Sequence, residues 1–148
     1  MADHLRKQIR DAVLMAINGL ATTGTRVEVG RTRPLAEDHD PTLLVYTPSE
    51  TSKRELMGRP PIIGRPMTLV IEGRVQSTQP PDDVLDTIAL EVEPAMAQDT
   101  RLGGLVLDVE LTSTEINVQA PGTKHIGAIR MSYLVRYQTA QGVPDTAA

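Results

Sequence analysis

The first periodic segment lies near the start of the chain, where apolar side chains recur at intervals of three and four residues. They are Leu5, Ile9, Val13, Ala16, Ile17 and Leu20. Charged side chains occupy the other side of the same helical projection, so the spacing predicts an amphipathic helix over residues 3–20. Asp3 is the expected N-cap, and Gly19 or Gly24 can end the helix in the left-handed conformation.

Five later segments have the pattern of β-strands. Short β-prone runs occupy residues 26–30 and 42–47, and the second run is continuously apolar. Apolar and polar residues alternate over 67–75, less regularly over 105–118, and again over 125–139. We therefore expect five strands, with a possible bulge at the glycine in position 73.

A second helix is expected between the third and fourth of these strands. It starts at Pro80-Pro81, because proline is tolerated in the first helical turn. Its apolar stripe consists of Val84, Leu85, Ile88, Val92 and Met96. Pro94 falls inside this stripe and predicts a kink, and Gly103-Gly104 ends the helical region.

The resulting order, α-β-β-β-α-β-β, predicts an α+β fold. The chain has 148 residues, which fits one domain over 1–148. We expect a single mostly antiparallel β-sheet with two helices packed on one face, a long loop between the second and third strands, and a flexible C-terminal tail over 140–148. The uncovered face is expected to keep apolar groups at Val70, Val106 and Leu134, a feature of partner interfaces.

The connection over residues 49–66 is unusually long, polar and rich in proline. Structureless loops of more than about 12–15 residues are uncommon in compact domains and are usually functional or disordered. Its basic side chains are Lys53, Arg54, Arg59 and Arg65, and its expected apolar anchors are Met57, Ile62 and Ile63. Glu50 and Glu55 interrupt the basic set and no aromatic residue accompanies it, so contact with protein is favoured over a nucleic-acid arm.

Three aspartates, Asp82, Asp83 and Asp86, lie at the start of the second expected helix. The macrodipole of a helix favours negative charge at this end, which suffices to explain all three. An intersubunit salt bridge or a contact with a divalent ion is the alternative, and both interpretations can hold together.

Composition excludes several classes of function. The chain has no cysteine, so disulfides, cysteine nucleophiles and cysteine-based metal sites are excluded. The net charge is −4 and the aromatic residues are three tyrosines, which disfavours general nucleic-acid binding. No apolar run is long enough to span a membrane, and the first residues lack the apolar block of a signal peptide, so we expect a protein made and kept in the cytosol.

No catalytic constellation can be assembled from the sequence. The three histidines are isolated, and no zinc-protease, nucleophile-elbow, P-loop or dinucleotide motif is present. His39 with Glu37, Asp38 and Asp40 could bind a metal, but such runs are mostly solvated turns. We expect no enzyme activity, no cofactor and no metal.

Several segments carry a resemblance to a known family. They are HLRKQIRDAVLMAINGL, TTGTRVEVGRTRPL, TLLVYTPSE, MTLVIEGRVQ, PPDDVLDTIALEVEPAM and GAIRMSYLVRYQT. In their order, these segments resemble the tail terminator family of long-tailed bacteriophages, which includes the lambda-type minor tail protein U. The resemblance covers nearly the whole chain.

The resemblance implies a structural protein that forms a ring, typically a hexamer, on the head-proximal end of the tail tube. Such a ring stops polymerisation of the tube protein and provides the surface for joining the head. The implied partners are copies of the chain, the major tail tube protein and a head-completion or connector protein, and genomic DNA passes through without specific binding. The implied location is the neck of the virion, after assembly in the host cytoplasm.

Asp82 and Asp86 match the acidic positions of the family's second helix, which implies a place at or near the subunit interface. The segment 49–65 differs most from the lambda-type pattern and could face a neighbour or the tube. Three alternatives stay open. They are another neck component such as a head-closure or tail-completion protein, a ferredoxin-like ligand- or nucleic-acid-binding module, and, last, a cryptic enzyme.

Overall fold

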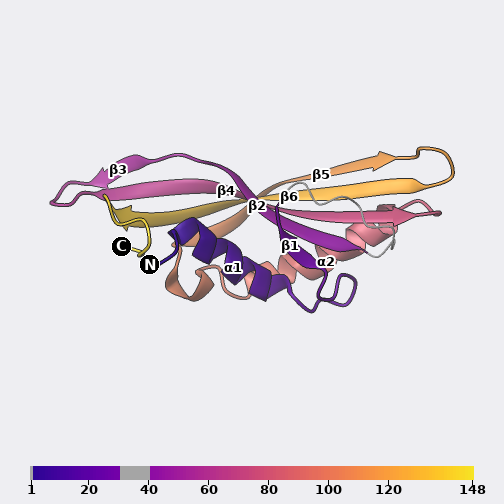
Figure 1. Cartoon of the computed structure of the whole chain (residues 1–148), viewed down its shortest axis with the longest axis horizontal. Helices are drawn as coiled ribbons and strands as arrows, with labels where there is room; N and C mark the ends of the chain where they lie inside the picture. Colours follow the sequence, from indigo (N-terminus) through magenta and orange to yellow (C-terminus); the bar gives the residue numbers. More distant parts are fainter. Residues whose placement is uncertain (1, 31–40) are drawn as a thin grey trace.

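The computed structural model describes residues 2–30 and 41–148, which form one six-stranded sheet with helices on one face (Figure 1). The helices are α1 (Leu5–Ile17) and α2 (Asp82–Ala97), and a short 3-10 helix, η1 (Leu102–Gly104), follows α2. The strands are β1 (Val27–Val29), β2 (Thr42–Glu50), β3 (Lys53–Leu56), β4 (Ile62–Ser77), β5 (Asp108–Gln119) and β6 (His125–Ala140). The expected α+β class is confirmed.

The strands follow the spatial order β1-β2-β4-β6-β5, and β3 pairs with the beginning of β4. Only β1 and β2 run parallel; the other described pairs are antiparallel. The two 16-residue strands β4 and β6 pair along their whole length, from Ile62 with Ala140 to Ser77 with His125. These two strands form the long axis of the molecule, and the helices cover its middle (Figure 1).

The core lies between the helices and one face of the sheet. The predicted stripes supply it, with Ile9 and Val13 from α1, and Ile88 and Val92 from α2. The sheet contributes alternate residues of β2, β4 and β6: Leu43, Val45, Met67, Leu69, Ile71, Ile129, Met131, Tyr133, Val135 and Tyr137. Val106 also lies in this core, so its predicted place on the uncovered face is wrong.

The start of α1 differs from the prediction. His4, not Asp3, is the N-cap, and its Nδ1 accepts a hydrogen bond of 3.0 Å from the backbone N–H of Arg6. Asp3 is instead paired with Lys7 at 3.1 Å. An imidazole nitrogen satisfies the same unpaired backbone donor that a carboxylate would, so the helix begins one residue later than the preferred capping residue suggests.

The bulge predicted at Gly73 is absent, whereas the kink predicted at Pro94 stays a prediction. The helix α2 passes through Pro94 and ends three residues later at Ala97. Gly73 is paired in register on both sides, so it is not a bulge; the shift in β2–β4 pairing lies between Tyr46 and Ser49. A β-carbon on Gly73 would lie 3.1 Å from the side chain of Ile88, which shows that this glycine lets α2 pack closely on the sheet.

The segment 49–66 connects the strands as expected, but it is not an irregular loop. It holds the end of β2, all of β3 and the first residues of β4, and it extends the sheet beyond the helices (Figure 1). We call residues 51–61, which contain β3 and the following turn, the arm. Pairing of Lys53 with Gly64 and Arg54 with Ile63 satisfies backbone groups that an unpaired loop would leave to water.

The C-terminal residues, expected to form a flexible tail, fold back onto the body. The carbonyl of Pro144 accepts a hydrogen bond of 2.7 Å from the backbone N–H of Leu5, and Ala147 bridges to Thr139. The backbone N–H of Ala148 also donates to Gln138 at 3.0 Å. The tail thus covers the edge of β6 and the start of α1.

Candidate functional site

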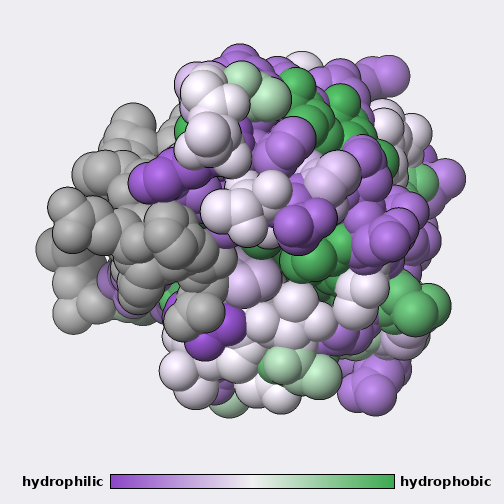
Figure 2. Space-filling view, turned by 90° about the vertical axis from the view of Figure 1, so that its right-hand side faces the viewer, coloured by the Kyte–Doolittle hydropathy of each residue, from purple (hydrophilic) through white to green (hydrophobic). Residues whose placement is uncertain are grey.

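The three aspartates are exposed at the start of α2. Asp82 and Asp83 occupy the first turn and Asp86 follows one turn later, and none forms an ion pair with another described residue. Their placement fits helix-start electrostatics. The face that carries this end of α2 is largely hydrophilic, with separate hydrophobic groups between the polar ones (Figure 2). Their assignment to a subunit interface stays a prediction.

The predicted residues of segment 49–66 divide into two groups. Residues 51–60 are all exposed, and Met57 at the turn of the arm is 84% exposed. Arg54 and Arg59 make no ion pair with a described residue. Ile62 and Ile63 are half-buried members of β4. The arm lies at the opposite end of β4 from the aspartates, so the structure does not bring the two predicted sets together (Figure 1).

Arg65 points inward and belongs to a cluster around Glu50 at the base of the arm. The Glu50 carboxylate pairs with Arg6 at 2.8 Å and with Arg65 at 3.4 Å, and it accepts a hydrogen bond from the Tyr137 hydroxyl. Burial, followed by this hydrogen bond, raises the pKa of Tyr137. Arg65 also donates to Thr139 at 2.9 Å. Arg65 therefore has an internal role in the single chain, and its predicted external contact stays a prediction.

A second cluster surrounds Glu72 on the face of the sheet that the helices leave uncovered. Glu72 is only 3% exposed and accepts hydrogen bonds from Tyr46 at 2.9 Å, from Arg74, and from Arg130 at 3.3 Å. Burial alone would raise the pKa of Glu72, but the hydrogen bonds from Arg74 and Tyr46 outweigh it, so this pKa lies below its usual value. The carboxylate is therefore ionised at neutral pH.

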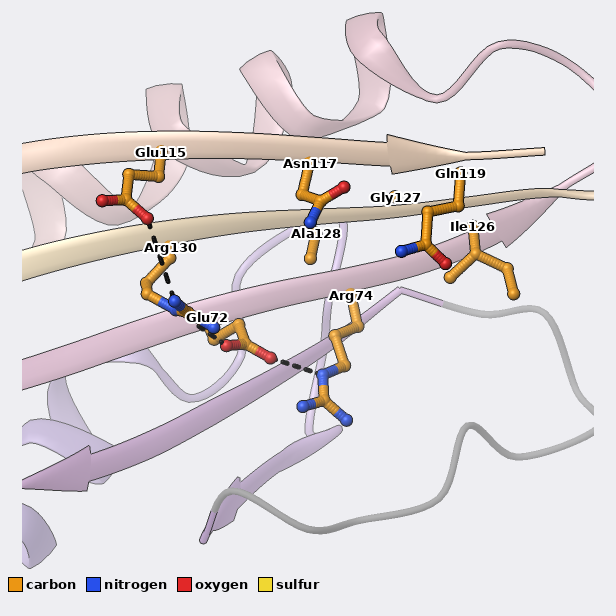
Figure 3. Close-up of a pocket in the computed structure, with 9 residues that line it drawn as sticks. All are labelled: Glu72, Arg74, Glu115, Asn117, Gln119, Ile126, Gly127, Ala128 and Arg130. Carbon is orange, nitrogen blue, oxygen red and sulfur yellow. Dashed lines mark hydrogen bonds and ion pairs between the residues drawn. The ribbon is translucent and has the colours of Figure 1, made fainter. Parts of the chain in front are cut away.

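A shallow hollow of about 280 Å³ lies beside this cluster, between β4, β6 and β5. Figure 3 shows its charged side chains as one series of ion pairs, from Glu115 to Arg130, Glu72 and Arg74. The two acidic and two basic groups balance one another. Their pairing across three strands indicates that they hold the sheet together rather than present a free charge to a ligand.

A second hollow, which we call the groove, runs between the C-terminal half of α2 and β5. It has a volume of about 390 Å³, and its lining includes Glu93, Pro94, Met96, Val109, Leu111 and Tyr133. Tyr133 is 4% exposed, and its hydroxyl is buried without a hydrogen-bond partner. Burial, with a smaller effect of the Glu93 charge, raises the pKa of Tyr133 to about 12. The described lining of the groove is thus mostly apolar, with one carboxylate, Glu93.

Sequence reasoning missed both glutamate clusters and the groove. Glu50 was interpreted as an interruption of a basic loop, and Glu72 as an ordinary polar position of an alternating strand. The alternation does place Glu72 on the uncovered face, but only the register of β4 with β6, which sets Glu72 opposite Arg130, reveals the ion pair.

The three histidines give no metal site within residues 2–30 and 41–148. His4 caps α1, His125 begins β6, and no group of three or more acidic or histidine side chains in these ranges is placed to hold a metal. The predicted alternative at His39, Glu37, Asp38 and Asp40 lies outside the described residues. In the described part of the chain, no helix has both the length and the apolar character to cross a membrane.

The chain is similar to a chain from the virion of a native gene transfer agent particle, with 14% sequence identity and a TM-score of 0.34, over 90% of this chain and 92% of the other. No protein-family model and no curated protein matches the sequence.

Proposed function

We propose that this chain is a structural tail terminator of a phage-type particle. Copies of the chain form a ring on the head-proximal end of the tail tube, stop its polymerisation and present a surface for joining the head. The chain catalyses no reaction in this role. Its partners are further copies of itself, the tube protein and a head-completion or connector protein.

The observation that carries the proposal is the arm, considered with the sequence resemblance. Leu56 and Met57, at the end of β3 and in the turn that follows, are 59% and 84% exposed. Large apolar groups held out from the body by a paired strand are costly to leave in water and supply contact area when a partner covers them. A structural subunit that acts through repeated contacts requires a feature of this kind.

The flanks of the sheet support a head-to-tail arrangement. The arm pairs with the edge of β4 that faces away from β6, whereas β5 lies on the other flank. Contacts between two different surfaces produce closed rings when the rotation between copies closes. Such a ring has two unlike faces, one for the tube and one for the head side. The net charge of −4 suits a channel through which DNA passes without adhering.

Tube assembly tests this proposal. Tail tubes are polymerised from their purified tube protein with and without the chain, and their lengths and ends are examined by electron microscopy. We expect growth to stop when the chain is added, with a ring at one end of each tube. A chain that stays monomeric at high concentration and leaves tube growth unchanged would contradict the proposal. A ring in another layer of the neck would assign the chain to a head-closure or tail-completion role.

The arm offers a matched pair of variants for the same assay. Met57→Asp places a charge at an 84% exposed position of the arm, and Met15→Asp does the same at an 81% exposed position of α1. Both variants should remain folded. We expect Met57→Asp to weaken ring formation at least about tenfold, because burying the new carboxylate costs more than about 1.4 kcal/mol, while Met15→Asp retains assembly. Equal behaviour of the two variants would remove the arm from the contact.

A further inference from the structure

We infer that the arm of one copy docks into the groove between α2 and β5 of the next copy. This inference rests on the proposed ring and names the two surfaces that meet in it. The groove is occupied by the arm of a second copy, with the side chains of Leu56 and Met57 against its apolar base.

The positions of the two surfaces allow this contact between copies. The arm pairs with β4 on the flank opposite β6, and the groove borders β5 on the far side of β6. Each copy therefore carries one arm on one flank and one groove on the other. Repetition of this contact leads from copy to copy in one direction, as a heterologous ring requires.

The charges of the two surfaces are complementary. Residues 51–61 contain three basic side chains and one acidic one, a formal charge of +2. The acidic one, Glu55, accepts a hydrogen bond from the side chain of Gln138. Among the described residues that line the groove, Glu93 is the charged one, and it is acidic. Glu93 has no ion pair among the described residues, whereas Asp108 and Glu110 pair with Arg136 on the other face of the sheet and do not line the groove. Such complementarity selects a partner and orients it.

In the single chain, one polar group at the groove lacks a hydrogen-bond partner. The side chains of Met96 and Val109 form an apolar base, and the Tyr133 hydroxyl beside them is buried without a partner. A buried hydroxyl without a hydrogen bond is costly. An arginine of the arm, such as Arg54 or Arg59, can pair with the Glu93 carboxylate when the arm is in place.

Disulfide cross-linking tests the contact directly, because the chain contains no cysteine. Met57→Cys marks the turn of the arm, and Ala97→Cys marks an exposed position that also lines the groove. Under mild oxidation of the assembled protein, the double variant should give a ladder of covalent multimers. A mixture of the two single variants should stop at dimers that contain one copy of each.

The control replaces the arm position by a matched one. Met15→Cys with Ala97→Cys places the first cysteine at an equally exposed methionine of α1, and we expect no ladder. Rings that form and cap tubes but give no link between positions 57 and 97 would overturn this inference and leave the proposed function intact. A chain that forms no ring at any concentration or on tubes would overturn both.

Discussion

Two glutamates on opposite faces of the sheet, the half-buried Glu50 and the buried Glu72, bind the same kinds of side chain but join different parts of the molecule. Glu50 lies on the helix-covered side and Glu72 on the uncovered side, and each binds two arginines and one tyrosine hydroxyl. The partners of Glu50 come from α1, β4 and β6, so this carboxylate joins the helical layer to the sheet. The partners of Glu72 all lie in the sheet, so it joins β2, β4 and β6 to one another.

This difference indicates that the exposure of the partner side chains decides how much stability is lost when the carboxylate is removed. Around Glu50, the side chain of Arg65 is 15% exposed and Tyr137 is fully buried, so neither can turn to water if the carboxylate is removed. Around Glu72, the side chain of Arg130 is 52% exposed and can be solvated. The cost of breaking an ion pair is largely the cost of the charge left behind.

Glu50→Ala should have the largest effect. It leaves Arg65 and the Tyr137 hydroxyl buried without their carboxylate, and we expect the free energy of unfolding to fall by about 3–5 kcal/mol. Urea denaturation of the variant measures this loss. Because the cluster holds α1 against the base of the arm, amide exchange in α1 should also accelerate. A loss below about 1 kcal/mol would show that the cluster behaves as an exposed ion pair.

Glu72→Ala should have a smaller effect, because Arg130 gains water in place of the carboxylate. We expect a loss of about 1.5–3 kcal/mol, the range for hydrogen bonds to a charged group. The same denaturation experiment gives the ranking of the two variants. If Glu72→Ala were the more damaging of the two, the exposure of the partners would not explain the difference between the clusters.

The smallest effect is a pH dependence of stability that Glu72 contributes. Its pKa is lowered in the folded chain from a usual value of 4.5, so the folded state binds this proton less readily than the unfolded state. The contribution is therefore complete above about pH 4.5 and is lost as the pH falls through the folded pKa. The difference in unfolding free energy between the native chain and Glu72→Gln should be constant near neutral pH and narrow on acidification. If this difference in unfolding free energy grew on acidification, folding would raise the pKa of Glu72 instead of lowering it.

Much of the fold could be predicted from periodicity. The final strand, expected over 125–139, is β6 (His125–Ala140), and its alternating apolar residues, Met131 and Tyr133 among them, face the core. The helices were also predicted, because their apolar stripes repeat over more than three turns. The segment that contains the arm was expected to contact something outside the body, which stays a prediction. Its strand pairing was missed because KREL shows no alternation and has a single apolar residue. Pairing there comes from the proximity of β4 and not from local preference.

The sequence by itself determined the fold class, the composition of the core and the exposed, basic character of the arm, because these follow from residue type and spacing along the chain. Only the tertiary structure decided which charges are paired, that Arg65 faces inward while Arg54 and Arg59 face water, and that an apolar groove lies on the flank opposite the arm. These properties depend on strand register and on the order of strands in the sheet. A shift of one residue reverses the side on which each side chain lies, and no local pattern in the sequence fixes that register.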